Sequence, residues 1–423
     1  MRVGHRVRRR RVLNRRGAIA VLLALLLIPL LLFVAFCVDI GWIAKTKSEL
    51  QNAADAAAEA GARQLADNYG AYTVAGSQNG ASLVSSAKQN ASTFINKYGQ
   101  YNGAGGVKSL SILSGDVHYG FTDANGNFNA SYAGYPNTVQ VTARRDSSAN
   151  SPLALFFGSF AGKTTESLTT TAAATIYTGL ISSFDPSGGG VSSGATFTGG
   201  GGGWGELYQS SGNGFQCSLL PVAFDVNYWI SFVATGVSPD GSTHTSNGQA
   251  QIQIYPSPNQ APGNFGLLCI GAPTNADPSY VNWILNGPSA DDLQYLIDND
   301  EVPVSQQSPV AWKGSPGLKS NLVSDFASII GQPRLLPLFQ PASSNPYQAA
   351  TGNGSNTKYN IVGFVGVSVT QATGSGSNMN ISVTPCGVVD PTAVFSPSSV
   401  YPAGAQPSGQ LNSFTFVGAK LTK

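Results

Sequence analysis

The stretch AIAVLLALLLIPLLLFVAFCV, residues 18–38, runs for 21 residues without a charged side chain. A helix needs about 20 apolar residues to cross the ~30 Å hydrocarbon core of a bilayer, so a transmembrane helix is predicted over residues 17–38. A cytoplasmic basic arm, residues 1–16, precedes it and holds eight arginines: Arg2, Arg6, Arg8, Arg9, Arg10, Arg11, Arg15 and Arg16. Short basic flanks stay on the cytoplasmic side. We therefore expect a single-pass protein of the cytoplasmic (inner) membrane, with its N-terminus in the cytoplasm and its C-terminal bulk extracytoplasmic.

A cleaved signal peptide is the alternative interpretation of this stretch. The apolar run is longer than the hydrophobic region of a signal peptide, which typically has about 7–15 residues. Its end, Ala35-Phe36-Cys37, places a cysteine where a small cleavage-site residue is expected, and the bulky Phe36 does not suit a lipoprotein signal. The residues favour a retained membrane helix, whereas cleavage would release the protein.

The charges are unevenly distributed along the chain. The net charge is +2, but the residues after the basic arm hold 15 Lys and Arg against 21 Asp and Glu. The arm is expected to attract anionic lipid head groups, so membrane lipid is the first predicted partner. The rest of the chain has no basic stripe, and we expect no nucleic-acid binding.

A second helical pattern follows the membrane stretch. The segment KTKSELQNAADAAAEAGARQLADN, residues 45–68, is rich in helix-forming residues. Leu50, Ala54, Ala57 and Gly61 recur at helical spacing and form a face of mostly small side chains. Small residues allow a neighbouring helix to approach closely, which favours a shaft that packs against partner helices. The alternative is a helix that packs on its own domain.

Short motifs occur in a fixed order around the membrane stretch. Arg-Arg-Gly precedes it, Asp-Ile-Gly follows it, and Gln-Asn-Ala-Ala-Asp lies further on; the residues are Arg15, Arg16, Gly17, Asp39, Gly41, Gln51, Ala54 and Asp55. This combination, over residues 14–66, resembles the N-terminal module of TadE/TadG-like Flp (Tad) pilus-assembly proteins. The resemblance implies an envelope protein that crosses the membrane once and serves an adhesive pilus system. It also implies a long N-terminal helix capped by a small sheet.

Two departures limit what the resemblance implies. Prepilin processing in related systems uses a Gly followed five residues later by Glu, but the fifth residue after Gly17 is Leu22. Pilin-type cleavage and packing as a major shaft subunit are therefore not expected. Some TadG-like proteins carry a von Willebrand A domain with an Asp-x-Ser-x-Ser metal site. In this chain Tyr228 and Trp229 follow the candidate Asp225 and the serines are missing, so we predict no metal there.

The N-terminal part beyond the membrane reads as a helix-plus-sheet module over residues 39–180. A further helical pattern covers residues 82–98, and alternating strand patterns fill residues 107–178. A Gly/Ser-rich linker is expected over residues 181–206.

Residues 207–423 are expected to form a β-rich ectodomain. Residues 251–255 and 359–370 have the strongest strand patterns in this part. The predicted fold class is α+β: an N-terminal transmembrane or long helix with a pilin-like small antiparallel sheet, followed by the β-rich C-terminal ectodomain.

No group of residues in the sequence has the spacing of a catalytic site. The string GVSSG at residues 190–194 matches a nucleophile elbow, but it lies in the predicted linker and not between a strand and a helix. The string GSFAGKT at residues 158–164 resembles a phosphate-binding loop but is one residue short. We expect no enzyme activity, no cofactor and no metal.

The cysteines carry one further prediction. Cys37 lies in the membrane stretch, whereas Cys217, Cys269 and Cys386 lie in the C-terminal part. Oxidising conditions outside the cytoplasm permit disulfides. These three cysteines allow one intramolecular disulfide and leave one thiol, and the sequence does not fix the pairing.

The sequence patterns predict a membrane-anchored extracytoplasmic structural protein, and the resemblance implies that it is a component or accessory of Tad/Flp-type pilus assembly, anchoring or adhesion. Pilus-assembly or envelope proteins are expected to bind through the N-terminal helix. The alternative is a membrane-tethered envelope protein that binds a ligand or a polysaccharide and has no connection to pili.

Overall fold

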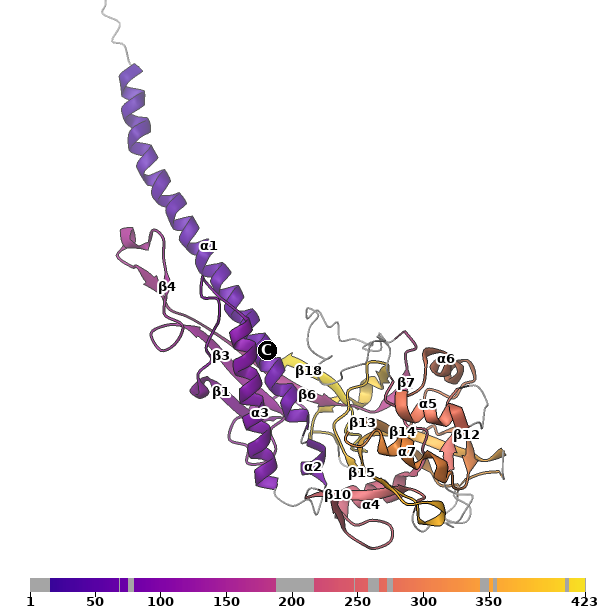
Figure 1. The fold of residues 1–423 in the computed structure, drawn as a ribbon. Coiled ribbons are helices and arrows are strands. Elements are labelled where there is room, and N and C mark those ends of the chain that lie inside the picture. Colours follow the sequence, from indigo (N-terminus) through magenta and orange to yellow (C-terminus); the bar gives the residue numbers. More distant parts are fainter. Residues whose placement is uncertain are drawn as a thin grey trace, which may run out of the picture.

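One long helix leads into the folded part of the molecule (Figure 1). The computed structural model describes residues 16–67, 69–74, 80–187, 217–246, 248–257, 266–271, 277–342, 350–352, 356–407 and 411–422. Helix α1, Arg16–Asp67, has 52 residues and continues through Pro29. At about 1.5 Å per residue it is roughly 80 Å long. The long N-terminal helix that the resemblance implies is therefore confirmed.

The second half of α1 lies against a membrane-proximal unit made of two helices and one antiparallel sheet. Helix α3, Gly80–Tyr101, packs beside α1, and the short α2, Tyr69–Thr73, lies between them in the chain. The sheet order is β2-β1-β3-β6-β18, and β17 pairs with the end of β6. Its strands are β1 (Val117–Thr122, after the 3-10 helix η1, Ser114–Asp116), β2 (Phe128–Asn129), β3 (Thr138–Arg145), β6 (Leu168–Thr178), β17 (Tyr401–Pro402) and β18 (Phe416–Thr422).

The sheet is amphipathic because side chains alternate between its two faces. In β6, Leu168, Thr170 and Ala172 are buried, whereas Thr169 and Thr171 are exposed. β3 and β6 are the strands in closest contact with α1. The helices thus cover one face of the sheet.

A small hairpin projects from this unit beside α1 (Figure 1). It consists of β4, Leu153–Ala154, and β5, Thr165–Glu166, with the 3-10 helix η2, Gly158–Ala161, in its turn. In Figure 1 it reaches further along α1 toward the N-terminus than the sheet does.

The distal unit is an eight-stranded sheet flanked by short helices. Its sheet order is β11-β12-β14-β15-β10-β9, with β13 between β14 and β8. The strands are β8 (Phe224–Asp225), β9 (His244–Ser246), β10 (Gln249–Tyr255), β11 (Gly266–Leu268), β12 (Val310–Pro316), β13 (Pro333–Gln340), β14 (Lys358–Thr373) and β15 (Asn380–Pro385). The helices are α4 (Val226–Thr235), α5 (Asp277–Asn286), α6 (Ala290–Asp298), α7 (Val323–Ala327), and the 3-10 helices η4 (Ser320–Leu322), η6 (Gly376–Asn378) and η7 (Pro397–Ser399).

The two units are not consecutive along the chain, which corrects the expected division into residues 39–180, 181–206 and 207–423. β18 pairs with β6 from Phe416↔Thr178 to Thr422↔Ala173, so the last strand belongs to the membrane-proximal sheet. Residues expected in the linker form β7, Ile181–Phe184, which pairs with β16, Ala393–Phe395. Residues 188–206 of that linker lie outside the described residues. The chain leaves the first sheet, builds the distal unit and returns.

The α+β class predicted from the sequence is confirmed. The helical pattern over residues 82–98 forms α3, and the two strongest strand patterns of the C-terminal part form β10 and β14.

Candidate functional site: the long helix and its supports

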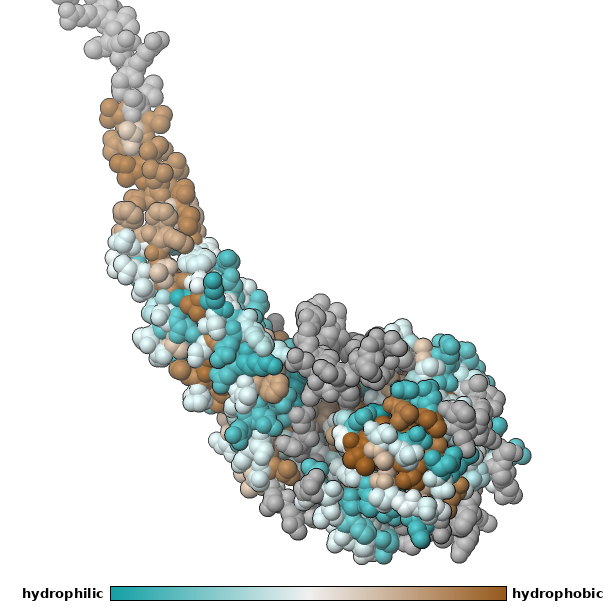
Figure 2. Space-filling model, viewed as in Figure 1, coloured by the Kyte–Doolittle hydropathy of each residue, from teal (hydrophilic) through white to brown (hydrophobic). Residues whose placement is uncertain are grey.

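The N-terminal half of α1 is an apolar rod that projects from a largely polar body (Figure 2). Leu22, Leu25 and Phe33 are 67%, 67% and 69% exposed. Among the described residues α1 is the one helix that is long and apolar enough to cross a membrane. Of the predicted motif, Arg15 lies outside the described residues, and Arg16 and Gly17 begin the helix.

The small-residue face of α1 is buried within its own chain. Leu50, Ala54 and Ala57 are fully inaccessible, and this part of α1 packs against α3, β3 and β6. A Cβ added at Gly61 would meet Ile95 Cδ1 at 2.7 Å and Val139 Cγ1 at 3.2 Å. The prediction that this face of α1 packs against partner helices is therefore wrong, because α3 and the sheet already cover the face. The alternative, a helix that packs on its own domain, describes this half of α1.

Asp39 connects the end of the membrane stretch to the folded part. Its side chain is buried, and its two carboxylate oxygens accept the backbone N–H groups of Phe156 at 2.8 Å and Phe157 at 3.0 Å. Gly41, two residues further on, is exposed and a Cβ there would touch nothing within 4 Å. Gly61 and Gly41 thus differ: a side chain at Gly61 would collide with Ile95 and Val139, whereas one at Gly41 would not.

Gln51 and Asp55 link α1 to itself and to the sheet. Gln51 Nε2 donates to Asp55 Oδ1 at 2.8 Å, one turn along the helix, and approaches Thr171 O at 3.5 Å. Together with Asp39 and Ala54, these motif residues all serve packing or hydrogen bonding of α1 against the rest of the chain. The structure therefore brings the predicted motif residues together along one helix but not into a reactive cluster.

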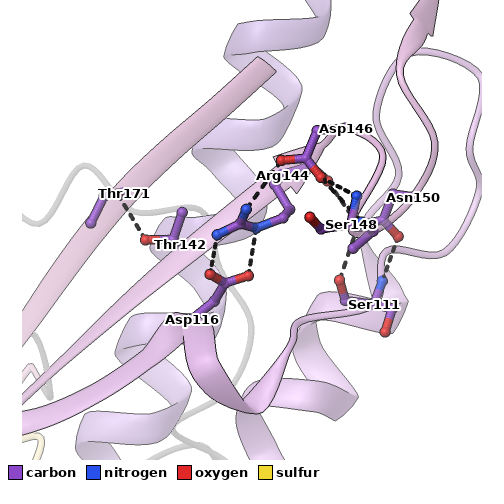
Figure 3. A network of polar contacts seen from close by, with 9 residues as sticks. Ser111, Asp116, Thr142, Arg144, Asp146, Ser148, Asn150 and Thr171 are labelled. Carbon is purple, nitrogen blue, oxygen red and sulfur yellow. Dashed lines mark hydrogen bonds and ion pairs between the residues drawn. The ribbon is translucent and has the colours of Figure 1, made fainter. Parts of the chain in front are cut away.

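An ion-pair network holds the start of the segment that leads to the β4–β5 hairpin (Figure 3). Arg144, at the end of β3, makes a two-pronged contact with the Asp116 carboxylate and donates to Asp146 Oδ2 at 3.1 Å. Hydrogen bonding to Asp116 raises the pKa of Arg144. Asn150 Nδ2 donates to Arg144 O at 2.8 Å and to Ser111 O at 3.0 Å. Residues 146–150 are therefore held by hydrogen bonds to Arg144, at the end of β3, and to Ser111, in the segment before η1.

Arg145 points to the opposite side and is buried. Its guanidinium donates to the carbonyl oxygens of Ala104 and Gly105, both at 2.7 Å, and of Ser151 at 2.9 Å. Desolvation lowers its pKa. The Gly105 N–H in turn donates to Glu49 Oε2 at 2.8 Å, which connects the loop to α1. Sequence analysis missed this clamp, although Arg145 continues the buried alternation of Val139, Val141 and Ala143 in β3.

The C-terminal residues singled out in the sequence do not assemble into a site. Asp225 ends β8 and caps α4 by accepting the Asn227 N–H at 2.8 Å, and burial raises its pKa. Cys217 and Cys269 are buried and Cys386 is half-buried, and the disulfide among these three cysteines stays a prediction. Cys269 Sγ lies 3.5 Å from Tyr280 Oη, and burial raises the pKa of the Cys217 thiol. The elbow-like string at residues 190–194 lies outside the described residues, and residues 158–161 of the loop-like string form η2.

Glu301 is a partly buried carboxyl group in the distal unit. Among the described residues its Oε2 atom has no hydrogen-bond partner. Desolvation raises its pKa to about 7, and the charge of Lys358 opposes this shift. The pKa of this carboxyl group is therefore higher in the folded chain than in the unfolded chain, where it is about 4.5. Protonation of Glu301 favours the folded state, and this contribution to the free energy of unfolding is fully present below about pH 4.5. That contribution is lost as the pH rises through about 7.

We expect Glu301→Gln to flatten this part of the pH–stability curve. At pH 8 the substitution should raise the free energy of unfolding by about 1–2 kcal/mol, a value reduced for the partial exposure of the group. At pH 4.5 it should change little. Urea unfolding of the full chain at both pH values measures the difference. Asp291→Asn, on the exposed side of α6, is the control. Parallel curves for Glu301→Gln and the unmodified protein would contradict the assignment.

Comparison with known proteins identifies one family. Residues 17–64 match the family described as "Putative Flp pilus-assembly TadE/G-like". The match confirms the resemblance of the N-terminal module and coincides with α1. No curated protein and no solved structure matches the chain significantly.

Proposed function

We propose that this chain, which carries a TadE/G-like N-terminal module, is a membrane-anchored extracytoplasmic structural component or accessory of Tad/Flp-type pilus assembly. One observation carries the proposal: the matched segment is a single unbroken helix with an exposed apolar first half and a second half built into the fold. Such a helix suits a protein held in a bilayer that presents its folded part on one side. We propose a role in anchoring or adhesion and no catalytic one.

The arginine arm supports an orientation. Eight arginines within the first sixteen residues favour a cytoplasmic N-terminus in the inner membrane. The folded units would then lie outside the cytoplasm.

Partner proteins are proposed to contact the membrane half of α1. The small-residue face around Ala57 is already covered by α3 and the sheet, whereas Phe36 is 58% exposed. In a bilayer, helices associate through packing contacts along exposed faces such as this one.

Site-specific photo-crosslinking in cells that express the full chain tests the proposal. A photoreactive residue at position 36 is expected to give crosslinks to pilus-assembly proteins, identified by mass spectrometry. The same residue at position 57 is expected to give none, because that position is inaccessible. Removal of the chain should also reduce surface pili, and the full chain should restore them. Normal piliation without the chain, with no pilus protein crosslinked at position 36, would overturn the proposal.

A further inference from the structure

The β4–β5 hairpin exposes three phenylalanines within five residues. Phe156, Phe157 and Phe160 are 63%, 39% and 76% exposed. Phe160 is the most exposed of the large apolar side chains in the described part of the chain. Single exposed apolar residues are ordinary on protein surfaces, whereas several large ones close together in the chain point to an interaction site.

The position of this phenylalanine cluster is fixed relative to the membrane stretch. Asp39 binds the backbone N–H groups of Phe156 and Phe157, and the ring of Trp42 lies 5.6 Å from that of Phe156. Asp39 is the first charged residue after the apolar run that ends at residue 38. The contacts with Asp39 therefore place the cluster at the level where α1 changes from apolar to polar, and Figure 1 shows the hairpin beside α1.

The base of the hairpin is firmly held. Arg145 clamps the carbonyl groups of Gly105 and Ser151, and Asn150 bonds to both the N–H and the carbonyl of Ser111. These bonds end just before β4 begins at Leu153. The phenylalanine cluster therefore has a defined position along α1, because hydrogen bonds hold the base of the hairpin and also the backbone of Phe156 and Phe157.

We propose that this hairpin is a second membrane contact, whose phenylalanine cluster enters the interfacial layer of the bilayer that α1 crosses. The inference rests on the proposed membrane anchoring by α1. Phe, like Trp and Leu, is typical of apolar surfaces that enter this layer. Phe156 also packs against Trp42, which lies on α1 just after the apolar run. Lys45 and Lys163 are mostly exposed at the same end of the unit, and each is paired with a carboxylate, Glu49 and Glu166 respectively. Their charges are locally balanced, so the contact should not require anionic lipid.

Two attachment points have a mechanical consequence. A single helix leaves the folded part free to rotate about the helix axis and to tilt. A hairpin that enters the same bilayer beside the helix restricts both the rotation and the tilt, because a second contact away from the helix axis has to stay at the membrane surface, as interfacial anchors of membrane helices do. The distal unit would then face a constant direction relative to the membrane.

The test is tryptophan quenching by lipid in the full chain. Phe160→Trp is reconstituted into nanodiscs of phosphatidylcholine whose acyl chains are brominated near the head group, and its emission is compared with that of the unmodified protein. We expect the added emission to be largely lost in brominated lipid. Ile330→Trp, on the distal unit at a position that is 48% exposed, should keep its added emission. Asp39→Ala should reduce the quenching at position 160, because it removes the acceptor of two N–H groups.

A further variant separates failure of this inference from failure of the membrane anchor. Phe33→Trp places a tryptophan within the apolar run and should be quenched if α1 crosses the bilayer. Quenching at position 33 without quenching at position 160 would overturn the hairpin contact alone. Absence of quenching at both positions would overturn the anchor and the hairpin contact together. Loss of emission at position 160 that follows the protein-to-lipid ratio and not bromination would assign the cluster to a second copy of the chain, and would overturn the proposal.

Discussion

Gly61→Leu is expected to destabilise the membrane-proximal unit by about 3 kcal/mol, at the upper end of the cost of overpacking a core. The added Cβ alone would lie 2.7 Å from Ile95 Cδ1 and 3.2 Å from Val139 Cγ1, before the rest of the leucine is accommodated. α3 and β3 would both have to move away from α1. Urea unfolding of the full chain in nanodiscs, followed by far-UV circular dichroism, measures the loss.

Gly41→Leu is the matched control, since it makes the same substitution in the same helix. A Cβ at Gly41 meets nothing within 4 Å. Replacing glycine in a helix also removes its unfavourable helix propensity, worth up to about 1 kcal/mol, so stability should be unchanged or slightly higher. If Gly61→Leu left stability intact and reduced only the crosslinks to other proteins, the small-residue face would be a partner interface after all.

The sequence predicts α1 well because its signals are local. An apolar run, a helical period and strong helix formers lie close together in the sequence, and they predict helix over residues 17–38 and 45–68 where the structure has Arg16–Asp67. The same signals cannot say what covers a small-residue face. The sequence around Ala54 and Ala57 would be the same whether a second protein or α3 packed against these residues. That choice depends on residues more than twenty positions away, so the sequence leaves both alternatives open, and the structure shows that α3 and the sheet cover the face.

The path of the chain through both units is a non-local property. β18 has an ordinary strand sequence, FVGAKLT, and nothing in these seven residues indicates β6 as its neighbour. Arg145 is different, because the alternation of β3 places it on the buried face and a buried arginine requires acceptors. The burial of Arg145, and its need for hydrogen-bond acceptors, could therefore be predicted from the sequence. The pairing of β18 with β6 could not.

Phe414→Ala is expected to lower the free energy of unfolding by about 3–5 kcal/mol, the usual cost of removing a fully buried phenylalanine ring. Phe414 has no exposed surface and lies just before β18. Its ring centre is 6.5 Å from that of Tyr69 in α2 and 6.1 Å from that of Trp229 in α4. One ring therefore contacts both the membrane-proximal and the distal unit, and its loss should weaken both.

Two probes can distinguish a loss of stability in both units from a loss in only one of them. Near-UV circular dichroism reports the packing of Trp229 in the distal unit, and protease sensitivity within residues 146–150 reports the membrane-proximal unit. We expect both transitions to shift together in Phe414→Ala, because the chain closes the first sheet only after completing the distal unit. Leu421→Ala, at a position of β18 that is 43% exposed, should change stability by less than about 0.5 kcal/mol. A shift in one transition alone would show that the two units are independently stable. In that case β18 would complete the membrane-proximal sheet without coupling its stability to that of the distal unit.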